Sequence, residues 1–196
     1  MNKKGETLLE VLIALTLITV SSAAAASAII SSTQSLYLSK NYIVAQNLAS
    51  EGIEIVKNIR DTNWMKFSQN TQQCWLNIQN IDLPSDCPSA EKFTYNASPQ
   101  NFYAVNFDDE SGKWMAEKVT NSIDINPIPN AYALVNSGGK YVEPGPSVSP
   151  SFYRAITITG GDGTTNVTVQ SIVKWYEGSR LYSVTGMTAL NNYTEG

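Results

Sequence analysis

The amino-acid sequence predicts an α+β fold in which one long N-terminal helix packs on a C-terminal antiparallel sheet. Two observations predict the helix: an uncharged apolar run near the N-terminus and an amphipathic repeat of three- and four-residue steps that continues from it. A third observation predicts the sheet, because apolar and polar side chains alternate between Gly- and Asp-containing turns in the C-terminal half. We expect the helix to have a protruding hydrophobic half and an amphipathic half.

The apolar run is long enough to cross a membrane. Residues 11–39 contain no charged side chain, and the densest apolar part covers residues 8–30. A helix needs about 20 apolar residues to span the hydrocarbon core. Lys3 and Lys4 precede the run, and the positive-inside rule therefore places Met1 in the cytoplasm and the rest of the chain outside.

Three interpretations of this N-terminus compete. It is a secretory signal cut near the small residues 21–28, an uncleaved anchor, or a segment that is trimmed near its basic start. Only the third interpretation explains Glu10, since a carboxylate just inside an apolar segment is costly and usually has a partner. Cleavage after Gly5 would create an ammonium group at Glu6, and the ammonium of one subunit could neutralise Glu10 of its neighbour.

The residues from Gly5 to Leu15 read Gly-Glu-Thr-Leu-Leu-Glu-Val-Leu-Ile-Ala-Leu. This stretch resembles the prepilin cleavage and methylation motif of the type IV pilin-like family. In that family a peptidase cuts after the glycine, the new N-terminus is methylated, and a glutamate occupies the fifth mature position. Gly5, Glu6 and Glu10 match these three roles. The first mature residue departs from the family, which usually has Phe where this chain has Glu6.

The resemblance implies a domain map and a set of partners. Residues 1–5 would be the leader peptide, 6–30 the transmembrane and assembly half of the helix, and 31–196 an extracytoplasmic globular domain. The implied partners are other pilin subunits, the prepilin peptidase, and membrane lipid before assembly. The residues of the motif favour a minor pilin or minor pseudopilin. The resemblance implies that the precursor is a single-pass protein of the inner or cytoplasmic membrane and is later built into a surface or periplasmic filament.

The helix continues beyond the apolar run as an amphipathic segment. A stripe of mostly apolar residues recurs at helical spacing, and Asp61 begins a plausible helix end. A helix over residues 6–60 would be roughly 80 Å long, which is too long for one small domain to cover. We therefore expect its second half to pack on the chain's own domain. The stripe consists of Leu38, Tyr42, Ala45, Ala49, Ile53, Val56 and Arg60.

Strand patterns dominate after an irregular, proline-containing segment at residues 61–100. Strands are predicted at residues 101–107, 113–119, 152–159, 167–176 and 180–190, and a long loop at 126–151 with a short strand at 132–135. Val167, Val169, Ser171, Val173 and Trp175 alternate with more polar neighbours. This alternation predicts a sheet with one face on the helix.

Composition excludes several classes of function. The chain has no histidine, which rules out Ser–His–Asp and Cys–His catalysis within it. It has 13 Lys and Arg against 17 Asp and Glu, for a net charge of −4, and no basic stretch that would indicate nucleic-acid binding. We expect no catalytic residue and no cofactor. We also expect no metal ion, because the acidic turns near Asp108 and Asp162 are typical of solvated turns. A membrane-anchored or secreted binding or adhesion module stays as the alternative to a filament subunit.

The cysteines and tryptophans are assigned structural roles. Cys74 and Cys87 are the chain's two cysteines, and a pair beyond an export segment favours a disulfide. In the chain-entropy model a bridge closing a loop of this size stabilises a fold by about 3 kcal/mol. The four tryptophans could form a sugar-binding surface, but core or interface packing is the preferred interpretation. They are Trp64, Trp75, Trp114 and Trp175.

Overall fold

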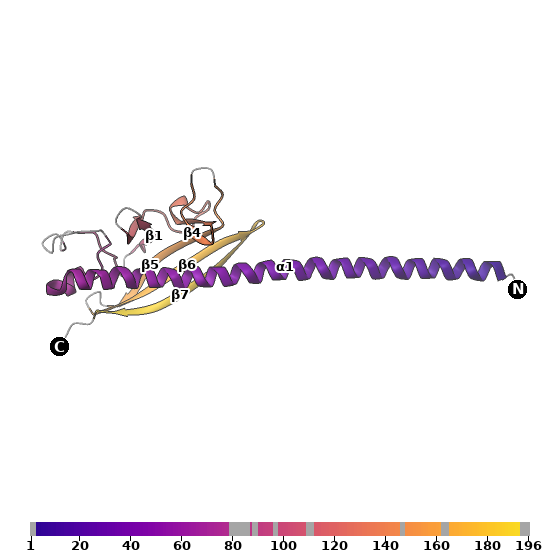
Figure 1. Cartoon of the computed structure of the whole chain (residues 1–196), viewed down its shortest axis with the longest axis horizontal. Helices are drawn as coiled ribbons and strands as arrows, with labels where there is room; N and C mark the ends of the chain where they lie inside the picture. Colours follow the sequence, from indigo (N-terminus) through magenta and orange to yellow (C-terminus); the bar gives the residue numbers. More distant parts are fainter. Residues whose placement is uncertain are drawn as a thin grey trace. The chain divides into compact units, whose positions relative to one another are not determined.

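The computed structural model describes residues 3–78, 87, 90–95, 98–108, 112–145, 148–161 and 165–192. The chain divides into two compact units, Met1–Tyr42 and Ile43–Gly196. Helix α1 (Lys3–Lys66) contributes to both units, and an antiparallel sheet follows it (Figure 1). This confirms the α+β class, and the architecture is pilin-like.

Two short helical turns follow α1: η1 (Ser68–Asn70) and α2 (Thr71–Cys74). The strands of the described chain are β1 (Phe102–Asp108), β2 (Lys113–Val119), β3 (Ala133–Ser137), β4 (Lys140–Val142), β5 (Phe152–Gly161), β6 (Asn166–Glu177) and β7 (Arg180–Asn191), with the turn η3 (Asn130–Tyr132) before β3.

The sheet has long strands on one side of β5 and two short hairpins on the other. Strands β5, β6 and β7 pair in sequence order, and β6 and β7 pair along their full length. The opposite edge of β5 is shared: Ile156 pairs with Tyr103 of β1, whereas Tyr153 pairs with Ala133 of β3. Hairpins β1–β2 and β3–β4 therefore both leave the same edge of β5.

Two buried clusters of the second unit combine residues of α1 with residues of the sheet, and a third, which includes Phe102, Tyr132 and Ala155, contains no residue of α1. The alternation predicted for β6 is confirmed, because every second side chain of this strand is buried. Small residues let the helix approach closely. A β-carbon at Gly186 of β7 would lie 3.1 Å from Ile53 Cδ1 and 3.5 Å from Ala49 Cβ. Gly186 pairs with Ser171 of β6, which faces Gly52 of the helix.

The helical stripe is wider than predicted and partly displaced. Ala45, Ala49, Ile53 and Val56 are buried as expected, but Tyr42 is exposed and Arg60 is only half-buried. Helix α1 also buries four residues that each lie one position before a member of the stripe. These additional buried residues are Leu48, Gly52, Ile55 and Ile59.

The predicted helix end at Asp61 is wrong, because α1 continues to Lys66. Asn63, a poor helix former, is held there by tertiary contacts. Its buried side-chain amide donates to the backbone carbonyls of Trp75 (3.2 Å) and Asn77 (2.8 Å). These bonds attach the segment after α2 to the helix and outweigh the local preference for ending it.

The short strand predicted at residues 132–135 is present as β3, but the loop predicted around it at residues 126–151 is wrong in part, because it also contains the three-residue strand β4. The turn between these strands places Gly138 and Gly139 at φ values of 61° and 88°, a conformation that favours glycine. Asn136 Oδ1 accepts a hydrogen bond from the Gly139 amide at 3.1 Å. The Gly-Gly pair thus marks a hairpin turn and not an open loop.

Candidate functional site

The residues expected to act in processing and assembly lie in the first turns of α1. Gly5 and Glu6 belong to this helix, although the Glu6 side chain lies outside the described part of the chain. Glu10 follows Glu6 by four residues, which places the two positions on one helix face, one turn apart. The Glu10 side chain is exposed. Positions 6 and 10 therefore share one face at the start of the helix.

The apolar part of α1 is uncovered within its own unit. All side chains from residue 7 to residue 37 are exposed, and the large hydrophobic ones among them have exposed fractions of 51% to 68%. These side chains surround the helix instead of forming one stripe, which is typical of a helix covered by lipid or by other helices on all sides. They include Leu8, Leu9, Val11, Leu12, Ile13, Leu15, Leu17, Ile18 and Val20.

Five hydroxyl groups in this part of α1 donate to backbone carbonyls of the same helix. Thr16 and Thr19 donate to carbonyls three residues earlier, at 2.8 and 2.9 Å. Ser27, Thr33 and Ser35 donate to carbonyls four residues earlier, at 2.9 to 3.0 Å. Such bonds lower the cost of placing a hydroxyl in an apolar medium. These five residues therefore do not make the segment unsuitable for a membrane.

A membrane-spanning length is present in the described residues. Within residues 7–66 of α1, one 18-residue window has a mean hydropathy of 2.1 and none of its residues is buried. By length and composition this helix can cross a bilayer, and it is compatible with membrane anchoring.

Residues 1–26 match the family model for the prokaryotic N-terminal methylation motif. The chain carries a type IV pilin-like prepilin signal. No curated protein matches the chain, and no solved structure matches it. The prepilin signal describes a structural, pilin-like N-terminus and not an enzymatic domain. It also accounts for the position of the uncovered apolar residues, since it includes most of them.

The second unit contains the disulfide between Cys74 and Cys87, whose Cα atoms lie 5.5 Å apart. Both cysteines are fully buried and pack with Phe67 just after α1. Asn77 Nδ2 lies 3.3 Å from the Cys87 sulfur. The bridge closes the segment that follows the helix and fixes residue 87 next to it.

The acidic turns considered as metal sites lie partly outside the described residues, namely at Asp109, Glu110 and Asp162. Among the residues that the structure describes, no group of three or more His, Cys, Asp or Glu side chains could hold a metal ion.

One charged pair was not anticipated from the sequence. Arg154 on β5 is only 3% exposed, and its Nη1 lies 3.3 Å from Glu51 Oε1 on α1. Burial lowers the pKa of the guanidinium, and Glu51 opposes this effect through its charge and a hydrogen bond. The available signal was the position of Arg154 in the strand, between the inward-facing Phe152 and Ile156. A charged residue at an inward position indicates a buried ion pair or a site.

Proposed function

We propose that this chain is a minor pilin or pseudopilin, a structural subunit of a type IV pilus or a type II secretion-like filament. The observation that carries the proposal is the prepilin signal at residues 1–26, joined to a helix whose apolar side chains are exposed around its whole circumference. A helix of this kind needs lipid before assembly and the helices of other subunits afterwards.

In this proposal the precursor is inserted with Lys3 and Lys4 on the cytoplasmic side and the globular domain outside. The prepilin peptidase removes residues 1–5, and Glu6 becomes the mature N-terminus. The stretch at residues 21–28 consists of Ser and Ala only, and such small residues allow close helix approach in the filament core.

Glu10 gives assembly its register. An ionised carboxylate in a membrane-spanning helix costs about 3 kcal/mol on insertion scales. The amino group at Glu6 of a neighbouring subunit offsets this cost when the two groups form a charge-assisted hydrogen bond. Since Glu6 and Glu10 are one helical turn apart, the contact requires neighbouring helices to be displaced along the filament axis, and it therefore fixes that displacement.

Glu10→Gln tests this role, because it keeps the size of the side chain and removes its charge. In the native host, we expect the variant to be inserted and cleaved normally but to be depleted from sheared filaments or partner complexes. Glu54→Gln is the matched control, since Glu54 is an exposed glutamate of the same helix that pairs with Lys57. Incorporation of Glu10→Gln at the level of the control would contradict the assembly role.

A further inference from the structure

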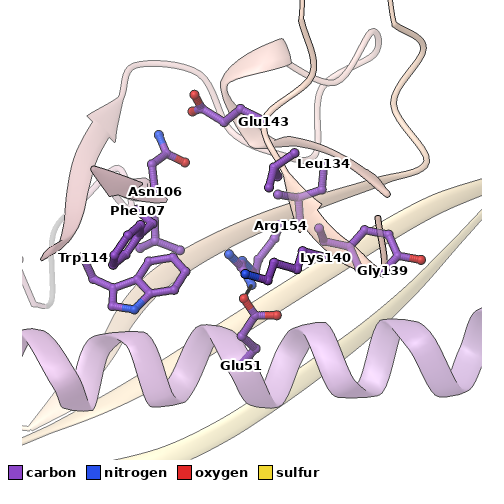
Figure 2. Close-up of a pocket in the computed structure, with 12 residues that line it drawn as sticks. Glu51, Asn106, Phe107, Trp114, Leu134, Gly139, Lys140, Glu143 and Arg154 are labelled. Atoms are coloured by element: carbon purple, nitrogen blue, oxygen red, sulfur yellow. Dashed lines mark ion pairs between the residues drawn. The ribbon is translucent and has the colours of Figure 1, made fainter. Parts of the chain in front are cut away.

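A pocket opens where the two hairpins leave the edge of β5. It has a volume of about 780 Å³, within the range of roughly 300–1,000 Å³ that is usual for small-molecule sites. Hairpin β1–β2 forms one wall, hairpin β3–β4 the other, and α1 lies below (Figure 2). The whole pocket belongs to the second unit.

The floor of the pocket is the buried guanidinium of Arg154, which has N–H donors that the protein does not use. The Nη1 of Arg154 contacts Glu51 Oε1 at 3.3 Å and donates to the Leu48 carbonyl at 3.5 Å. Both contacts use this one nitrogen, although a guanidinium carries five N–H donors on three nitrogens. Within the described part of the chain, no other hydrogen bond joins this guanidinium to the protein. Arg154 lines the pocket, so these donors are available to a ligand.

The walls combine an aromatic surface with polar groups of both kinds. Phe107 and Trp114 meet edge to face with ring centroids 5.3 Å apart, and Phe107 is 48% exposed. Asn106 lies on the same side, while Lys140 and Glu143 come from the opposite hairpin (Figure 2). The charged residues around the pocket are thus two cations and two carboxylates, and the pocket has no net formal charge.

We propose that this pocket binds an uncharged sugar ring of a glycan. A sugar ring has C–H faces that pack on aromatic rings and hydroxyl groups that both donate and accept hydrogen bonds. The Phe107–Trp114 wall fits the first property, and the Asn106 amide, the carboxylates and the spare Arg154 donors fit the second. Glu51 and Glu143 offset the charges of Arg154 and Lys140, so no net charge favours an anionic ligand, and a purely apolar ligand would leave the charged groups desolvated and without partners.

The test uses the full chain in detergent micelles and ligand-observed saturation-transfer NMR. The probes are glucose, galactose, mannose, N-acetylglucosamine and N-acetylgalactosamine, each at millimolar concentration, with glucuronic acid and sialic acid as anionic probes. We expect at least one uncharged sugar to bind and both anionic probes to bind more weakly. This measurement requires no filament, so its result is independent of the proposed function.

Two variants connect binding to the pocket. Phe107→Ala removes exposed aromatic surface, and Asn106→Ala removes an amide, and we expect each to weaken sugar binding about tenfold or more. Tyr176→Ala is the matched control, because Tyr176 is an exposed aromatic residue on β6 that does not line the pocket. Circular dichroism of each variant verifies the fold.

The proposal is overturned if none of the uncharged sugars binds, or if the anionic probes bind as tightly as the uncharged sugars. It is also overturned if Phe107→Ala and Asn106→Ala bind sugar as well as Tyr176→Ala does. Loss of binding in both pocket variants, with the control unchanged and all three folded, supports it.

Discussion

Gly52 of α1 lies against Ser171 of β6 so closely that a β-carbon on Gly52 would collide with the Ser171 hydroxyl. Ile156 Cδ1 and Arg154 Cδ also lie within 3.0 and 3.2 Å of that position. The contact sets the distance between helix and sheet in the middle of the second unit. Glycine is therefore required at position 52 by space, even though it is a poor residue for a helix interior.

Gly52→Ala should destabilise the second unit. Alanine gains about 1 kcal/mol of helix propensity, but overpacking a core usually costs about 1–3 kcal/mol, and three neighbours must move here. We expect a net loss of up to about 2 kcal/mol in the free energy of unfolding. Tryptophan fluorescence during denaturation measures it, because all four tryptophans lie in this unit. The exposed Ser50→Ala is the control and should change stability little.

A double-mutant cycle locates the cause. Among the described residues, the buried Ser171 Oγ has no hydrogen-bond partner, and Ser171→Ala should therefore be neutral or stabilising by about 1 kcal/mol. In that background Gly52→Ala should cost about 1 kcal/mol less than in the wild type. Equal costs in both backgrounds would show that the Ser171 contact does not limit the helix-to-sheet distance.

Glu51 is expected to contribute more to stability than Glu54, although both are on α1. Glu51 is the carboxylate beside the buried Arg154, whereas Glu54 pairs with the partly exposed Lys57. Glu51→Gln should lower the free energy of unfolding by about 1–3 kcal/mol, since it leaves a buried guanidinium without its counter-charge. Glu54→Gln should lower it by less than about 0.5 kcal/mol. Equal effects in chemical denaturation would contradict this account.

Asp124 is expected to make the loop before β3 sensitive to acid. Its carboxylate lies 2.6 Å from Lys174 Nζ, and Ser122 Oγ donates to it at 3.0 Å. The hydrogen bond from Lys174 lowers the pKa of Asp124 below its ordinary value of 3.8, against a smaller opposing effect of burial. The stabilisation is therefore complete well above pH 3.8 and is lost as the pH falls through the lowered pKa.

Comparing the wild type with Asp124→Asn across this pH range measures the effect. The stability difference should be below about 1 kcal/mol near neutral pH, because the Asp124 side chain is 65% exposed. It should disappear in acid and shrink in high salt. A difference that grew as the pH fell would contradict the assignment.

Removal of the disulfide should destabilise the segment after α1. Cys74 and Cys87 are 13 residues apart, and a bridge over such a loop contributes about 3 kcal/mol in the chain-entropy model. The double substitution Cys74→Ala and Cys87→Ala should reduce the free energy of unfolding by about this amount. Thiol labelling of unfolded, unreduced wild-type protein gives the matched check, and two reactive thiols in protein from its native compartment would oppose the assignment.

The sequence predicted the features that depend on local periodicity. The apolar run, the helix that continues from it and the alternation of β6 are all visible over a dozen or more residues. The helix end was missed because the amide of Asn63 bonds to distant carbonyls, and β4 was missed because three residues are too few for a periodic signal.

The pocket could not be predicted, because it depends on how the edge of β5 is divided between two hairpins. Arg154 lies at its floor and donates to the carbonyl of Leu48, which is 106 residues away in the chain. Only the register of the sheet against α1 brings such residues together. The prepilin signal was the opposite case, since all its determinants lie within a few residues of one another.

Gly5 controls processing in this account. Replacing Gly5 by a bulky residue such as Leu should leave an uncut precursor in the membrane, as judged by its size on a gel. The variant should still insert, because the apolar residues 8–30 are unchanged. If Gly5→Leu gave normal mature protein, cleavage would not depend on this glycine, which would contradict the account.

Mass spectrometry of the N-terminus of protein recovered from its native host tests the central claim most directly. The account predicts that the mature chain begins at Glu6, with or without one added methyl group. A chain that begins at Met1 would be a simple anchor, and one that begins near residues 26–28 would be a secreted protein; either result would contradict a pilin-like subunit.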